Sequence, residues 1–259
     1  MPAANYTTEF YEANWRGSLR SAEEVIPVVL EFIQPQRVVE LGCGVGAWLS
    51  VLKRHGAAEV IGVDGDYVNR EKMFIPAEEF IVHNLEKPFR IGRSFDLAIS
   101  LEVAEHLPQS SADAFVRSLT TLAPVVLFSA AIPFQGGTHH VNEQWPDFWA
   151  DIFRAQGFET IDCLRRRLWE NERVEWWYAQ NVLIYARNDF LAENAALHEA
   201  FERTCLSQLR LVHPKKYLAA VDPAFLGFRH LLPTARTVTL NALRRRARRS
   251  VSFLRDRVG

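Results

Sequence analysis

The sequence predicts an α/β protein built on one mostly parallel β-sheet. The first observation is a continuous apolar segment, residues 38–41, which has the character of a strand buried on both faces and runs into glycines at positions 42, 44 and 46. The second is that strand-like and helical segments alternate from there to residue 130. Strands that are joined through helices lie parallel, with right-handed crossovers.

The composition is that of an ordinary globular protein. The chain has 259 residues, 48% of them hydrophobic, and a net charge of −1, so nothing in its overall charge indicates nucleic-acid binding. Its 3 cysteines are too few and too scattered for a disulfide framework or a CxxC metal site. The N-terminus lacks an apolar leader and no run of about 18 apolar residues occurs, so we expect a cytoplasmic protein.

Residues 1–35 are predicted to form a helical cap. A short helix over 7–14 is followed by a break at Gly17 and Ser18. Ser21 and Glu24 then have the spacing of a capping box, which predicts a second helix that continues to Phe32.

The glycine turn after the first strand is predicted to bind a nucleotide-like ligand. Glycines let the backbone turn sharply, and the N–H groups at the start of the next helix, 47–55, point toward a ligand. The same glycines also satisfy the dinucleotide fingerprint, so they do not choose between cofactors. Glu40 discriminates between the cofactors, because a carboxylate two residues before the first glycine would repel a pyrophosphate but suits a cationic amino group.

The segment Glu40-x-Gly42-x-Gly44-x-Gly46 resembles motif I of the class I methyltransferases that use S-adenosylmethionine (SAM). The resemblance covers roughly residues 10–187. It implies a Rossmann-like sheet of seven strands, mostly parallel with the last strand antiparallel. It also divides the chain into the cap, a SAM-binding methyltransferase domain over 36–187 and a helical C-terminal extension over 188–259.

The next two strands complete the predicted cofactor site. The strand over 60–63 delivers Asp64, an acid that can accept hydrogen bonds from both ribose hydroxyls, and Gly65 leaves room for adenine. The strand over 80–83 ends at Asn84, where the family often has Asp, and the Asn carbonyl can accept from the adenine amino group. The predicted cofactor-binding residues are Glu40, Gly42, Gly44, Gly46, Asp64, Gly65, Asn84, Leu85 and Leu101.

Glu105 and His106 follow the fourth strand, 95–101. This region resembles the post-strand motif of small-molecule methyltransferases, and open α/β sheets bind ligands at the carboxyl ends of their strands. The N/D-P-P-Y/F tetrapeptide of enzymes that methylate nucleic-acid amino groups is absent, which disfavours a nucleic-acid partner. Two interpretations of Glu105 and His106 stay open, a catalytic role and a helix start that lines the pocket wall.

The loop after the fifth strand, 125–130, is rich in hydrogen-bonding side chains and contains two adjacent glycines. Such density predicts recognition of the methyl acceptor. Residues 136–145 also resemble a G-G-T-x-H-V-N-E-Q-W stretch of bacterial methyltransferases from surface-glycan and sugar pathways. The predicted substrate-binding residues in this loop are His139, Asn142 and Glu143.

His140 is the predicted general base. Imidazole has an unperturbed pKa of about 6.5, which suits accepting a proton from a hydroxyl group. Glu143 is close enough in the chain to orient the ring, or to join it around a divalent ion such as Mg²⁺. His139, His106 and Glu105 are alternative bases, and His140 could instead only shape the loop.

A helix over 145–156 is predicted to lead into an antiparallel pair of strands, 158–165 and 180–186, at one edge of the sheet. Three tryptophans lie between these strands. Their aromatic faces suit a sugar ring, and Trp176 is the predicted substrate-binding residue among them. The alternative is that they only close a hairpin over a helix.

The C-terminal extension is predicted to contain a helix over 190–211 and a basic amphipathic helix after residue 233. The second helix could lie on an anionic membrane surface, bind a phosphate-bearing acceptor, form a homodimer, or expose a solvated face. Its basic residues are Arg244, Arg245, Arg246, Arg248, Arg249, Arg255 and Arg257.

The predicted function is SAM-dependent O-methylation of a sugar or glycan hydroxyl. Methylation at nitrogen or oxygen of another small metabolite is the first alternative. Two alternatives come from different classes, an NAD-binding oxidoreductase, which Glu40 disfavours, and a non-catalytic SAM-binding protein.

Overall fold

A computed structural model describes residues 8–221 of the chain, with side chains from residue 15 onward. Contacts divide the chain into two units, residues 1–213 and 214–259, and in the second the described part is helix α9 (Pro214–Val221). The predicted basic helix after residue 233, with its membrane or dimer contact, lies outside the described residues. Within the described part of the chain, no helix combines the length and the apolar character needed to cross a bilayer.

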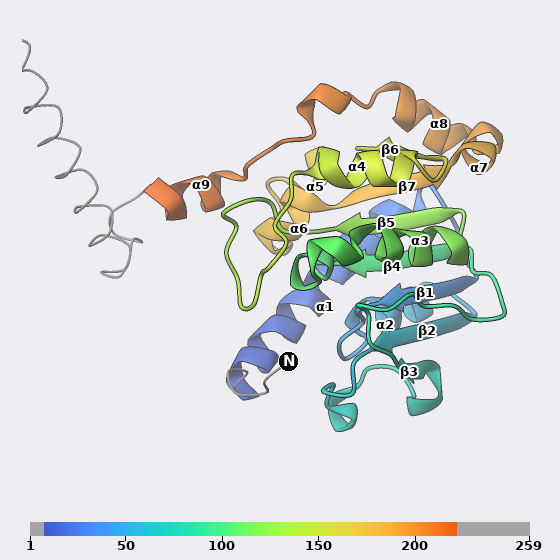
Figure 1. The fold of residues 1–259 in the computed structure, drawn as a ribbon, viewed down its shortest axis with the longest axis vertical. Helices are drawn as coiled ribbons and strands as arrows, with labels where there is room; N and C mark the ends of the chain where they lie inside the picture. Colours follow the sequence, from blue (N-terminus) through green and yellow to red (C-terminus); the bar gives the residue numbers. More distant parts are fainter. Residues whose placement is uncertain (1–7, 222–259) are drawn as a thin grey trace, which may run out of the picture. The chain divides into compact units, whose positions relative to one another are not determined.

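Seven strands form one sheet in the order β3-β2-β1-β4-β5-β7-β6 (Figure 1). The strand β7 is antiparallel to both of its neighbours, and the other pairs are parallel, which confirms the predicted architecture. The chain leaves β1 toward β2 and later returns on the other side at β4, so the carboxyl ends of β1 and β4 meet at a switch point of the topology. The strands are β1 (Arg37–Leu41), β2 (Glu59–Asp64), β3 (Phe80–Val82), β4 (Leu97–Leu101), β5 (Val125–Ser129), β6 (Phe158–Ile161) and β7 (Leu183–Arg187).

Helices cover both faces of the sheet, because the central strands are apolar on both sides. Every residue of β4 and β5 is buried. One hydrophobic cluster joins the sheet to α1 (Thr8–Leu30) and α2 (Ala47–Arg54), and a second joins it to α3 (Ala112–Leu122) and α4 (Pro146–Arg154). The short helices in the connections are η1 (Arg70–Lys72), η2 (Ala77–Glu79), η3 (Ala104–His106) and η4 (Gln109–Ser111).

The N-terminal segment is one continuous helix, so the predicted break and the predicted capping box are both wrong. The two serines that suggested them bind the helix α6 (Trp176–Asn181) and the residue before it instead. The Ser18 hydroxyl lies 3.0 Å from the Tyr178 hydroxyl, and Ser21 Oγ accepts from the Glu175 N–H at 3.0 Å. Partners that are about 150 residues away therefore decide the conformation here, and the local pattern does not contain them.

The tryptophan-rich segment between β6 and β7 forms two short helices, α5 (Arg165–Leu168) and α6, rather than a simple hairpin. Arg165 is the residue that fixes this arrangement, since its side chain is only 1% exposed. Its guanidinium donates to both carboxylate oxygens of Asp162, at 3.0 and 2.6 Å, and to the carbonyls of Gln180 and Leu209, at 3.2 and 2.7 Å. One buried cation thus ties the end of β6 to α6 and to the backbone at Leu209.

The helix predicted over 190–211 is divided at Asn194 into α7 (Asn188–Glu193) and α8 (Ala195–Glu202), followed by η5 (Leu206–Gln208). Asn194 caps α8, because its side-chain oxygen accepts from the Leu197 N–H at 2.9 Å. Its amide nitrogen donates to the Phe32 carbonyl at 3.0 Å.

We expect Arg165→Ala to lower the free energy of unfolding by about 3–5 kcal/mol, because it leaves two buried carbonyls and Asp162 without their donor. Urea unfolding followed by circular dichroism measures this change. Arg154→Ala is the matched control, since Arg154 forms an exposed pair with Asp151 and such pairs contribute little. Equal unfolding midpoints for the two variants would contradict the structural role of Arg165.

Candidate active site

The glycine turn after β1 is tightly held between strands. Gly42, Gly44 and Gly46 have φ angles of 86°, 51° and 79°, in the left-handed region that favours glycine. The Gly42 N–H donates to the Val63 carbonyl at 2.8 Å. A Cβ atom on Gly42 would lie 2.3 Å from the side chain of Val103, so the turn abuts the segment that follows β4.

Asp64, at the end of β2, holds this turn in shape. Its side chain accepts from the N–H groups of Gly44 and Gly65, each at 2.7 Å, and from the Tyr67 hydroxyl. Burial raises the pKa of Asp64, and these hydrogen bonds act in the opposite direction. A Cβ atom on Gly65 would lie 2.2 Å from the Tyr67 ring, so Gly65 makes room for an aromatic contact that the sequence did not reveal.

Glu40 is buried beneath the same turn. It is 2% exposed, and its Oε2 atom has no hydrogen-bond partner among the described residues. Burial raises the pKa of this carboxyl well above its usual range, and the nearby Asp64 carboxylate adds to the effect. A buried carboxylate without a donor is costly, so a cationic group bound at this place would be strongly favoured.

The remaining predicted cofactor residues line the same edge of the sheet. Leu85 and Leu101 are 8% and 6% exposed. Asn84 is exposed, and its side-chain oxygen accepts from the Glu86 N–H at 3.0 Å, which forms a turn after β3. Their contacts with a cofactor stay predictions.

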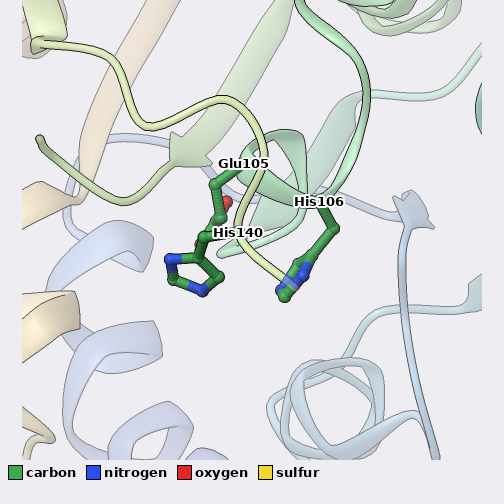
Figure 2. A group of neighbouring side chains, drawn as sticks. All are labelled: Glu105, His106 and His140. Carbon is green, nitrogen blue, oxygen red and sulfur yellow. The ribbon is translucent and has the colours of Figure 1, made fainter. Parts of the chain in front are cut away.

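Glu105, His106 and His140 come together beside the carboxyl end of β4 (Figure 2). One potential metal-binding atom from each side chain lies within 4.8 Å of the other two. Glu105 is fully buried, and neither of its carboxylate oxygens has a hydrogen-bond partner in the part of the chain that the structure describes. The imidazoles of His106 and His140 meet edge to face, with ring centroids 4.8 Å apart.

Backbone hydrogen bonds bring His140 into this cluster. The N–H groups of Val141 and Asn142 both donate to the Glu105 carbonyl, at 2.8 and 3.0 Å. They fix the loop after β5 on η3, so two segments that are about 35 residues apart in the chain share one site. The Asn142 side chain is buried and lies 3.4 Å from the Ala104 carbonyl, and its predicted acceptor contact stays a prediction.

Glu143 orients His140, as the sequence suggested. Its Oε1 atom accepts from His140 Nδ1 at 2.9 Å and from the Gly136 N–H at 2.7 Å, and its Oε2 atom accepts from the Phe134 N–H at 2.7 Å. The His140 side chain is 12% exposed, whereas His139 is exposed, so the adjacent histidines have different surroundings. One carboxylate therefore sets both the loop conformation and the tautomer of the imidazole.

The environment of the cluster favours uncharged side chains. Burial raises the pKa of the Glu105 carboxyl well above its usual range, and the adjacent Glu102 carboxylate adds to this. Burial also lowers the pKa of His106 to about 4, and the charge of His140 contributes. His106 is thus a neutral imidazole near pH 7, with one ring nitrogen able to accept a proton or bind a ligand. Groups with such shifted pKa values gather at functional sites.

Glu102 is a site residue that the sequence analysis missed. It has a left-handed φ of 54°, and its carboxylate accepts from the side-chain amides of Asn181 and Gln135, at 3.1 and 2.8 Å. Gln180 extends the network, since its amide donates to Gln135 Oε1 at 3.1 Å and its oxygen accepts from the His213 N–H at 2.8 Å. Two features of the sequence could have indicated this network. One is an acid three residues before Glu105, and the other is the pair of adjacent amides Gln180 and Asn181 in a segment predicted as a strand.

Trp176 begins α6 and is half-buried, with its ring edge-on to Trp177 at a centroid distance of 5.5 Å. The far end of the same helix carries Asn181, which binds Glu102. The predicted sugar contact of Trp176 stays a prediction.

Comparisons with known proteins agree with this architecture. A family model described as a methyltransferase domain matches residues 15–181. The 24-methylenesterol C-methyltransferase 2 of Arabidopsis thaliana is 23% identical over 185 residues, which are 62% of this chain and 47% of that protein. The chain thus spans about half the length of this curated relative.

Two solved structures share the fold. A SAM-bound amino pentose methyltransferase from Micromonospora echinaspora, involved in calicheamicin biosynthesis, gives a TM-score of 0.51 at 15% identity, over 72% of this chain and 100% of that one. An O-methyltransferase family protein from Burkholderia thailandensis gives a TM-score of 0.50 at 16% identity, over 70% of this chain and 60% of that one.

We expect Glu143→Ala to loosen the loop over residues 134–143. The variant loses hydrogen bonds from two backbone N–H groups to a charged acceptor, each worth about 1.5–3 kcal/mol, so exchange of these amides should accelerate about 10–100-fold. Hydrogen exchange followed by mass spectrometry reports this for a peptide that spans the loop. Glu86→Ala, which changes an exposed glutamate, should leave the loop unaltered, and unchanged exchange in Glu143→Ala would disprove the role of this carboxylate.

Proposed function

We propose that this chain, which belongs to the methyltransferase-domain family, transfers the methyl group of SAM to a hydroxyl group of a sugar or glycan. One observation carries the proposal: a glycine turn above a buried, unpartnered carboxylate lies next to a cluster of imidazoles and a second buried carboxylate. The first part suits a cationic cofactor, and the second suits removal of a proton from an acceptor.

The buried carboxylates support SAM as the cofactor. The amino group of SAM is a cation, and it would give Glu40 the charged partner that this side chain lacks among the described residues. The ribose hydroxyls would donate to Asp64, where the Tyr67 hydroxyl already donates to the same carboxylate. A pyrophosphate would meet both negative charges, so an NAD-binding oxidoreductase is disfavoured, as family membership also indicates.

The reaction is an in-line displacement. The acceptor oxygen forms a bond to the methyl carbon while the bond from that carbon to sulfur breaks, and S-adenosylhomocysteine leaves as a neutral thioether. The sulfonium is a good leaving group, so the protein mainly aligns the substrates and removes the hydroxyl proton. His140 receives this proton on Nε2, because its Nδ1 atom is bonded to Glu143.

The acceptor is proposed to be a carbohydrate because of the loop after β5. This loop resembles that of methyltransferases from sugar and glycan pathways, and it exposes Phe134 to 88%, a surface on which a sugar ring can stack. A protein with the same fold is named as an amino pentose methyltransferase, so this fold is compatible with a sugar acceptor. Methylation of another small metabolite is the alternative, and the curated relative is itself named for a sterol.

Turnover is the first test. Release of S-adenosylhomocysteine with a panel of sugars and polysaccharides would support the proposal, whereas tight SAM binding with no turnover on any acceptor would indicate a non-catalytic SAM-binding protein.

We expect Asp64→Ala to weaken SAM binding about tenfold to a hundredfold, because charge-assisted hydrogen bonds worth about 1.5–3 kcal/mol are lost. Isothermal titration calorimetry measures the dissociation constant. Asp66→Ala is the matched control, because this acid lies two residues away and is exposed. An affinity that is equal in both variants would remove Asp64 from the cofactor site.

We expect His140→Ala and His140→Asn to reduce kcat about 10²–10⁴-fold while SAM affinity stays close to its original value. Methyl-transfer kinetics and SAM calorimetry are measured on the same preparations. His198→Ala, which changes an exposed histidine on α8, is the control. Near-normal turnover in both His140 variants would assign the proton to another group, with Glu105 and His106 as the next candidates.

A further inference from the structure

The Glu105 side chain is buried next to a second acid, Glu102. It is fully buried, and neither oxygen accepts a hydrogen bond from the described part of the chain. Burying a carboxylate without a hydrogen-bond donor is unfavourable, and a bound ion is one explanation for such a group in a native structure. Glu102, three residues before it in the chain, is a second acid rather than a donor, and its own carboxylate is held by two amides.

The two imidazoles beside Glu105 complete a set of metal ligands. The three potential ligand atoms lie within 4.8 Å of one another, and ligand atoms around a tetrahedral ion with bonds of about 2.1 Å are about 3.4 Å apart. Small side-chain rotations cover this difference. His140 is further prepared for this role, since Nδ1 is bonded to the Glu143 carboxylate, as in the carboxylate–histidine pairs that orient metal-binding imidazoles.

We propose that Glu105, His106 and His140 bind a divalent transition cation and that the acceptor hydroxyl completes its coordination. The inference rests on the proposed function and deepens it. Two nitrogen ligands and one oxygen ligand favour Mn²⁺, Co²⁺ or Zn²⁺ over the Mg²⁺ expected from the sequence, because Mg²⁺ prefers oxygen ligands. Three protein ligands leave positions open for a substrate.

The cation changes one step of the reaction. With the ion bound, His140 is a ligand, and the ion instead lowers the pKa of the coordinated hydroxyl group. The hydroxyl proton then passes to water, and the resulting alkoxide forms the bond to the methyl carbon as the bond to sulfur breaks. The site is well placed for this step, because Val103, two residues before Glu105, abuts Gly42 of the glycine turn.

Manganese binding tests the site without reference to the acceptor. The full chain, stripped with a chelator, is titrated with Mn²⁺ in the absence of SAM, and bound ion is followed by calorimetry and by loss of the aqueous Mn²⁺ signal in electron paramagnetic resonance. We expect one ion per chain. Glu105→Gln and His106→Ala should each weaken binding at least tenfold. Glu86→Ala and His198→Ala change exposed residues and should bind as the parent does.

A second measurement separates a ligand from a structural residue. Glu105→Gln replaces a buried acid with a neutral amide of the same size, so its metal-free thermal midpoint should be equal to or above that of the parent, while the stabilisation by added Mn²⁺ disappears. Absence of stoichiometric binding, or equal binding by Glu105→Gln and the parent, overturns the inference. Methyl transfer that continues in chelator would then leave the proposed function standing, whereas Mn²⁺ binding without methyl transfer to any carbohydrate would reject the acceptor and keep the ion site.

Discussion

The burial of acids at the carboxyl edge of the sheet is the constraint on which the rest of the site depends. Because helices cover both faces, the strands end in an environment with little water, and each acid there needs a donor. Asp64 receives three hydrogen bonds and Glu102 receives two amides, whereas Glu40 and Glu105 keep unpartnered oxygens. The hydrogen bonds to Asp64 and Glu102 hold the local structure in shape, whereas the unpartnered oxygens of Glu40 and Glu105 can still accept from a ligand.

This division could be predicted from the sequence only in part. The strands followed from continuous apolar segments, and the glycine turn with Glu40 and Asp64 followed from spacing, because both signals are local. The His140–Glu143 contact was also accessible, since the residues are three positions apart. The role of Glu102 could not be predicted, because the partners of its carboxylate, Gln135 and Asn181, are 33 and 79 residues away in the chain.

The same limit explains the errors in the helical regions. The continuous helix α1 depends on contacts with Tyr178 and Glu175, and the short helices before β7 depend on the buried guanidinium of Arg165. Tertiary partners override local preferences in each case. The region where local rules fail most, between β6 and β7, also carries Asn181, so it positions the candidate site as well as closing the sheet.

In the loop after β5, the residues that hold its conformation differ from those that form its exposed surface. Main-chain bonds to the Glu105 carbonyl and the single carboxylate of Glu143 hold its shape, while Phe134 and Val141 are 88% and 64% exposed. Substitutions at these two outward positions leave the anchors of the loop intact. If the loop receives the acceptor as proposed, a few surface substitutions would change which acceptor fits and leave the buried groups in place.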